Sequence, residues 1–356
     1  MAISAVSAHV PSLSIVEGGA PSGARSRLGT LLLDGSASIA VGAAVAAGVG
    51  VEAISSFTAR EAAGRWWLIA LLAVGLGLVV FGFCSRQPRP YVRVGLVVTA
   101  SDRRRGAAQA QQLNAAAESF SRQRSQLTLR VGGELAGDDT DPELVDRMAE
   151  EIRGAVTLAR RLVPDASGLD LIPTMPLHTA FRLGAKLGHT HATDIAVHAV
   201  SRCSGSQGYF PAVLLRAGEP AAAPLVLNTL RPLSAGDPAR AALALDLQNR
   251  GASFRAQVLA ACEQYGIGQL LLLRNPASTL RENMDTFTAV VDQAAQAWRD
   301  APLAPTARTG QHAVFLSGPV PIALALGARL ATTDAARWTA YTWDRSRSGY
   351  EPMPIG

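Results

Sequence analysis

Polar side chains that could bond a phosphate, a ribose or a base edge follow two apolar runs of this 356-residue chain. Thr99, Ser101 and Asp102 come at the end of a run rich in β-branched residues, and Gln248 with Asn249 stands at the comparable place in the second half. Hydroxyl, carboxylate and amide groups supply both donors and acceptors to a polar ligand. We take all five as candidate ligand-binding residues, although ordinary loop polarity would explain them equally well.

A second set of polar residues surrounds two strand-to-helix turns. Thr174 and His178 flank a proline in the first half, and Ser317 precedes a proline in the second half. Helix N-termini and the carboxyl ends of strands are common binding places in α/β proteins. We therefore add these three residues to the candidate site, with a half-buried structural histidine as the alternative for His178.

The sequence has no recognisable catalytic or metal-binding motif. The GxSxG, HExxH, Walker and Gly-rich dinucleotide patterns are absent. His189 and His191 lack a third ligand, and capping of a helix by Asp141 already explains the pair Asp139 and Asp141. We expect a binding protein that is not an enzyme and has no metal or cofactor.

The candidate residues belong to elements that alternate between strand and helix, which predicts an α/β fold. In the first half we expect strands at 91–99, 126–131, 169–173, 195–200 and 209–215, and helices at 105–122, 142–163 and 177–187. In the second half we expect strands at 241–246, 268–273, 313–316, 338–343 and 350–354, and helices at 254–264, 283–298 and 320–330. The two halves follow the same order.

The repetition extends to the residues themselves. The segments LIPTMPLHTAFRLGAKL and VFLSGPVPIALALGARL align at an offset of 143 residues, which superposes Pro176 on Pro319 and Gly184 on Gly327. Each half also ends with a strand that carries a Tyr-x-Pro element. Such agreement indicates a tandem duplication, and two Rossmann-like halves should pack about a pseudo-twofold axis with one shared cleft.

The chain before residue 90 predicts a membrane hairpin. Residues 66–84 form an uncharged run long enough to span a bilayer, and residues 35–51 form a shorter run of small apolar residues. Basic residues are denser outside the pair than in the short loop between the runs, which places both termini in the cytosol. We divide the chain into a disordered cytosolic tail (1–27), a two-helix transmembrane hairpin (28–85), and two α/β halves (91–217 and 223–356).

Composition narrows the class of protein further. The three cysteines are far apart, so neither a disulfide framework nor a zinc site is indicated. The net charge of +5 comes almost wholly from arginine and reflects composition more than a surface for nucleic acid. We expect no DNA or RNA polymer as a partner.

The residues quoted above resemble the SAVED domain of bacterial anti-phage CBASS systems. The resemblance covers about Tyr91 to Gly356 and is carried by LIPTMP with LGAKLG, VFLSGP with LGARL, and the Tyr-x-Pro elements. It implies two CARF-like halves whose joint cleft binds a cyclic oligonucleotide, usually a trinucleotide, made by a partner nucleotidyltransferase. It also implies a ligand-induced homo-oligomer that activates a fused effector.

Together with the hairpin, the resemblance implies a multi-pass protein of the bacterial inner membrane that contacts lipid. Ligand binding would then lead to membrane disruption in abortive infection. The alternative function is a membrane-tethered enzyme that processes a nucleotide or a sugar in the same cleft.

Overall fold

The computed structural model describes ten segments of the chain. They are residues 12–16, 93–102, 107–135, 142–189, 194–201, 208–216, 226–234, 236–277, 279–331 and 333–353. The chain divides into two compact units, one of residues 1–19 with 92–356 and the other of residues 20–91. All described elements belong to the first unit, and the expected hairpin (28–85) lies outside the described residues. Within the described segments, no helix is long and apolar enough to cross a membrane.

The first half forms a six-stranded mixed sheet in the order β1-β3-β2-β4-β5-β6. Its elements are β1 (Ser12–Val16), β2 (Arg93–Asp102), α4 (Ala107–Arg124), β3 (Leu127–Leu135), α5 (Pro142–Leu162), β4 (Gly168–Thr174), α6 (Leu177–Leu187), β5 (Ile195–Val200) and β6 (Tyr209–Leu214). The four inner strands are parallel, and β1 and β6 run antiparallel to their neighbours.

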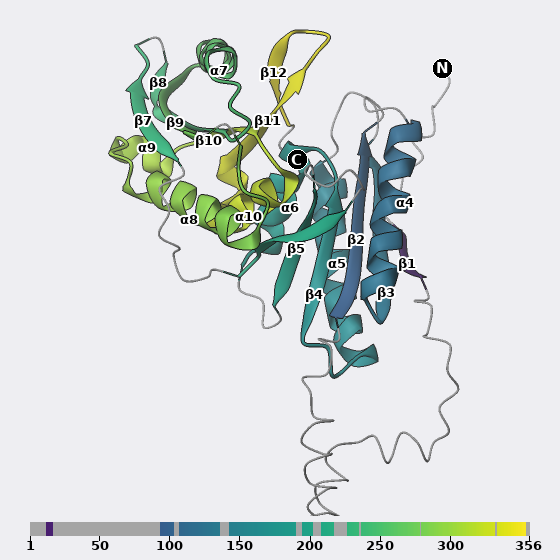
Figure 1. Ribbon diagram of the computed structural model, residues 1–356. Coiled ribbons are helices and arrows are strands. Elements are labelled where there is room, and N and C mark those ends of the chain that lie inside the picture. Colours follow the sequence, from purple (N-terminus) through teal and green to yellow (C-terminus); the bar gives the residue numbers. More distant parts are fainter. Residues whose placement is uncertain are drawn as a thin grey trace, which may run out of the picture. The chain divides into compact units, whose positions relative to one another are not determined.

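The second half repeats this plan in the order β7-β9-β8-β10-β11-β12. Its elements are β7 (Leu227–Pro232), β8 (Asp237–Asp246), α7 (Ala252–Gln264), β9 (Ile267–Arg274), α8 (Met284–Asp300), α9 (Pro305–Thr309), β10 (His312–Ser317), α10 (Val320–Leu330), the short 3-10 helix η3 (Ala335–Arg337), β11 (Trp338–Asp344) and β12 (Gly349–Pro352). Both edge strands are again antiparallel (Figure 1). The α/β class and the repeated order predicted from the sequence are confirmed.

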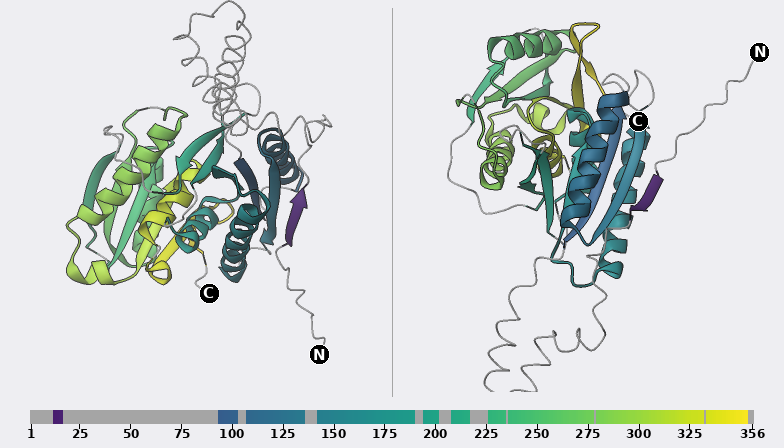
Figure 2. Two further views of the ribbon diagram at one scale, coloured as in Figure 1. Left: turned by 90° about the horizontal axis from the view of Figure 1, so that it is seen from below. Right: turned by 45° about the vertical axis from the view of Figure 1, so that its right-hand side comes forward.

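Strand β1 corrects part of the sequence prediction. It lies inside residues 1–27, which we expected to be a disordered tail, yet it pairs antiparallel with β3, from Ser12 opposite Gly132 to Val16 opposite Thr128. Figure 2 shows it at the edge of the first sheet. Its counterpart in the second sheet is β7, which pairs with β9 in the same manner. The tail prediction is therefore wrong for residues 12–16, which complete the sheet of the first half.

The two halves meet where helices α6 and α10 cross, between the two sheets (Figure 1). A Cβ atom added to Gly184 would overlap the carbonyl oxygen of Leu324, and one added to Gly327 would overlap the carbonyl oxygen of Phe181. The offset of 143 residues that relates Gly184 to Gly327 also relates Phe181 to Leu324. The contact is thus pseudo-twofold symmetric, and its close approach requires a residue without a side chain on each helix.

Each of these helices also contributes to the core of the opposite half. Ala323, Leu324 and Ala328 of α10 pack in the core of the first sheet, whereas Phe181 and Ala185 of α6 pack in the core of the second sheet. Burial of apolar area is the main favourable term in folding. Each half is therefore stabilised in part by a helix of the other half. This packing holds the strand ends of both halves at fixed positions around one pocket.

An ion cluster fixes the strands of the first sheet beneath α4. The carboxylate of Asp170 on β4 lies 2.6 Å from Nε of Arg93 on β2 and 3.0 Å from Nε2 of His198 on β5. Burial alone would raise the pKa of Asp170, but His198 and Arg93 together hold that pKa below its usual value. The cluster joins three adjacent strands, and we assign it a structural role.

The helix crossing predicts opposite effects for the same substitution at different glycines. Gly184→Ala and Gly327→Ala should each destabilise the chain by about 1–3 kcal/mol, because the helix backbones must move apart. Gly154→Ala, in α5 with open space around the added Cβ atom, is the matched control and should stabilise the chain by about 0.5–1 kcal/mol. Urea unfolding followed by tryptophan fluorescence checks both signs. Equal stability of the three variants would contradict the role of the crossing.

Candidate functional site

A pocket with a volume of about 840 Å³ is lined by residues of both halves. The first half contributes the start of α4 and the start of α6, through Gln109, Leu113, Pro176, Leu177 and His178. The second half contributes the segment after β8, the end of β10 and the β11–β12 hairpin, through Gln248, Arg250, Leu316, Ser317, residues 341–346 and Tyr350. The volume lies in the upper part of the range of about 300–1,000 Å³ that is typical of ligand pockets.

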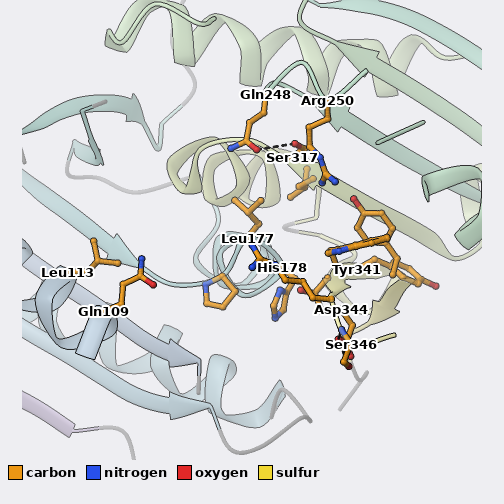
Figure 3. Close-up of a pocket in the computed structure, with 16 residues that line it drawn as sticks. Gln109, Leu113, Leu177, His178, Gln248, Arg250, Ser317, Tyr341, Asp344 and Ser346 are labelled. Carbon is orange, nitrogen blue, oxygen red and sulfur yellow. Dashed lines mark hydrogen bonds between the residues drawn. The ribbon is translucent and has the colours of Figure 1, made fainter. Parts of the chain in front are cut away.

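Three of the eight residues proposed from the sequence line this pocket. His178 lies at the start of α6, and Ser317 lies at the end of β10. The Ser317 hydroxyl donates a hydrogen bond of 3.4 Å to Oε1 of Gln248 (Figure 3). This hydrogen bond joins two residues that are 69 positions apart in the sequence. It does not test whether either residue binds a ligand.

The structure places the other proposed residues elsewhere. Thr99 is buried inside β2, which continues to Asp102, so this residue does not end a strand. Thr174 is half-buried at the end of β4 and does not line the pocket. Asn249 is exposed, with a φ of 54° that suits a tight turn. Ser101 and Asp102 end β2, and their side chains lie outside the described part of the structure.

Several lining residues were not among the sequence candidates, and most belong to the β11–β12 hairpin. Figure 3 shows Tyr341 and Asp344 on one side of the pocket and Gln109 on the other, with Leu177 and His178 between them. The hairpin was predicted only as two strands. The available signal was the run YTWDRSRSGY, in which aromatic residues flank a cluster of charged residues at a strand end.

The hairpin turn is held by its own carboxylate. Asp344 accepts hydrogen bonds from the backbone N–H of Ser346 at 2.8 Å and from its hydroxyl at 2.7 Å. The ring of Trp343 meets that of Tyr350 edge to face, with centroids 5.3 Å apart. These contacts fix the hairpin so that Trp343 lines the pocket.

The charged groups of the pocket favour an anion. Arg250 and Arg345 are exposed cations that line it, while the carboxylate of Asp344 is engaged by Ser346. Burial raises the pKa of Tyr341 and of Tyr350 to about 12, so both hydroxyls stay uncharged at neutral pH. The two tyrosines therefore add no negative charge.

Helix α6 adds a further positive element. No side chain caps its N-terminus, where Pro176 occupies the cap position. Leu177 and His178, its first two residues, line the pocket. The partial positive charge of a helix N-terminus favours phosphate and carboxylate groups. The site can accommodate a ligand that carries both anionic groups and planar rings. No metal-binding cluster occurs among the described residues.

Comparison with known proteins gives structural matches only. No protein-family model and no curated protein matches the chain. The solved Acinetobacter baumannii Cap4 SAVED/CARF-domain containing receptor with the cyclic trinucleotide 3'3'3'-cAAA matches with a TM-score of 0.47 and 13% identity, over 78% of this chain and 55% of that chain. The Moraxella osloensis Cap4 SAVED/CARF-domain containing receptor matches with a TM-score of 0.37 and 11% identity, over 80% of this chain and 64% of that chain. The chain thus spans less than two thirds of the length of these receptors.

Proposed function

We propose that the chain is a sensor that binds a cyclic oligonucleotide, a trinucleotide, in the pocket between its two halves. The observation that carries the proposal is the 840 Å³ pocket, which is lined by the guanidinium groups of Arg250 and Arg345, the half-buried ring of Trp343 and the uncapped N-terminus of α6. Arginine and helix N-termini bind phosphates, and an aromatic ring can stack on a base. The sequence resemblance to SAVED domains supports the same ligand class.

The proposed output is at the membrane. Residues 28–85 would form the two-helix hairpin in the bacterial inner membrane, with both termini cytosolic. Two helices cannot enclose an aqueous path, so several chains must assemble. A nucleotide from a partner nucleotidyltransferase would drive this homo-oligomer only by binding the assembled form better than the monomer. Membrane disruption of the infected cell would follow.

The position of β1 suggests how binding reaches the hairpin. The chain leaves the first sheet at Val16, opposite Thr128, and returns at β2, where Val94 lies opposite Leu127. Both points lie at the same end of the sheet, separated only by β3 and thus by about 10 Å. The pocket lies at the other end, beyond the carboxyl ends of the parallel strands. A shift of β3 would then move both ends of the hairpin together.

Binding is tested with the full chain in detergent. A cyclic trinucleotide should bind with one ligand per chain in calorimetry, and Arg250→Gln should weaken binding roughly tenfold to a hundredfold, since a hydrogen bond to a charged group contributes about 1.5–3 kcal/mol. Arg299→Gln, on the exposed face of α8, is the control and should bind like the parent. Unchanged affinity of the Arg250 variant would contradict the site.

The same sample separates the sensor from the enzyme alternative. Mass spectrometry of the recovered ligand should find the cyclic trinucleotide intact. Conversion of the ligand would instead favour a nucleotide-processing enzyme that uses this pocket, with His178 as the first residue to test.

Coupling through β1 is tested by dye leakage from liposomes that contain the full chain. The double substitution of Ser14→Pro with Ile15→Pro removes backbone donors from the β1–β3 ladder and should abolish ligand-dependent leakage while the ligand still binds. Ser14→Ala, at an exposed position, should leak like the parent. Leakage from the double variant would exclude this path. A parent that binds ligand but never leaks would exclude the membrane function itself.

A further inference from the structure

A second pocket, of about 540 Å³, lies wholly in the second half and contains three arginines. It is bounded by the sheet at β7 and β9 and by the start of α7. Arg231 projects from β7, Arg274 ends β9 and Arg255 lies in the first turn of α7. All of its described lining residues belong to the second half, which separates it from the pocket described above.

The cations of this pocket have no carboxylate partner. Arg231, Arg255 and Arg274 form no ion pair or hydrogen bond within the described parts of the chain, and Nε of Arg231 is buried without a hydrogen-bond partner. The one carboxylate of the lining, Asp246, accepts hydrogen bonds from the backbone N–H groups of Arg250 at 3.1 Å and Gly251 at 2.8 Å. A buried donor of a charged group without a partner is rare in proteins, and a bound water or anion would satisfy it.

The fold does not require arginine at these positions. The offset of 143 residues superposes Thr174 on Ser317, which lie opposite Thr99 and Asp246 on the next strand. Arg274, opposite Asp246, therefore corresponds to Gly132, opposite Thr99. Four residues earlier on each partner strand, Leu270 pairs with Arg231 and Thr128 pairs with Val16. The first half thus forms the same sheet with Gly132 and Val16 at these places, so packing does not explain the arginines.

Helix α7 strengthens the preference for an anion. It has 13 residues, begins after Gly251, and has no side chain that caps its N-terminus. Gly251 and the first helical residue line the pocket, so the positive end of the helix dipole is directed at the same place as the arginines. Three guanidinium groups in a recess, rather than on a flat surface, suit a compact polyanion.

We infer that this arginine pocket binds a soluble small molecule that carries phosphate groups, at a site separate from the inter-half pocket. The segment from Asp246 to Gly251 connects the two sites, because Gln248 and Arg250 line the inter-half pocket while Asp246 and Gly251 line the arginine pocket. The inference does not depend on the proposed ligand of the inter-half pocket.

Inorganic pyrophosphate serves as the probe, titrated into the full chain in detergent at constant ionic strength. The parent should bind one pyrophosphate per chain in calorimetry. Arg231→Gln with Arg274→Gln should weaken this binding at least tenfold, while Arg299→Gln should leave it unchanged. Pyrophosphate should also raise the unfolding temperature of the parent more than that of the double variant.

A second variant guards against a folding defect. Arg231→Val with Arg274→Gly introduces the residues that the first half carries at the corresponding positions, Val16 and Gly132, so it should fold and still bind the cyclic trinucleotide if the parent does. It should not bind pyrophosphate. Pyrophosphate binding by this variant with the parent's affinity, or no pyrophosphate binding by the parent, would overturn the inference.

Discussion

The close approach of two helix backbones at Gly184 and Gly327 sets the geometry of the binding unit. At this crossing each helix lacks a side chain where the carbonyl oxygen of the other lies, and each inserts apolar residues into the other half's core. The crossing therefore holds the start of α6 and the end of β10 beside the same pocket. A rigid crossing of this kind also limits how the halves can respond to a ligand, because packed helices shift as bodies and do not deform continuously.

Duplication produced two equivalent sheets, but the side chains around them have diverged. The inter-half pocket takes its arginines and aromatic rings from the second half, whereas the first half supplies mainly a helix start and amide or apolar groups. The same divergence places arginines on β7 and β9 where the first half has Val16 and Gly132. The two halves thus share the topology of the repeat, whereas the side chains that line the pockets differ between them.

Sequence reasoning was strongest where local signals agree. Helices α6 and α10 have the predicted bounds because a proline precedes each and an apolar face defines each. Strand β1 was missed because it has five residues and pairs with a strand more than 110 positions away. The hairpin of β11 and β12 was missed as part of the site because its role depends on tertiary packing against α6, which no local pattern reveals. Thr99 was predicted to end a strand because the apolar run stops there. The strand β2 instead continues to Asp102.

The central claim is that one ligand lies between the two halves. A structure of the full chain determined with a bound cyclic trinucleotide tests it most directly. The account predicts the ligand between the start of α6 and the β11–β12 hairpin, with a phosphate near Arg250 and a base against Trp343. A ligand bound to one half alone, away from these residues, would contradict it.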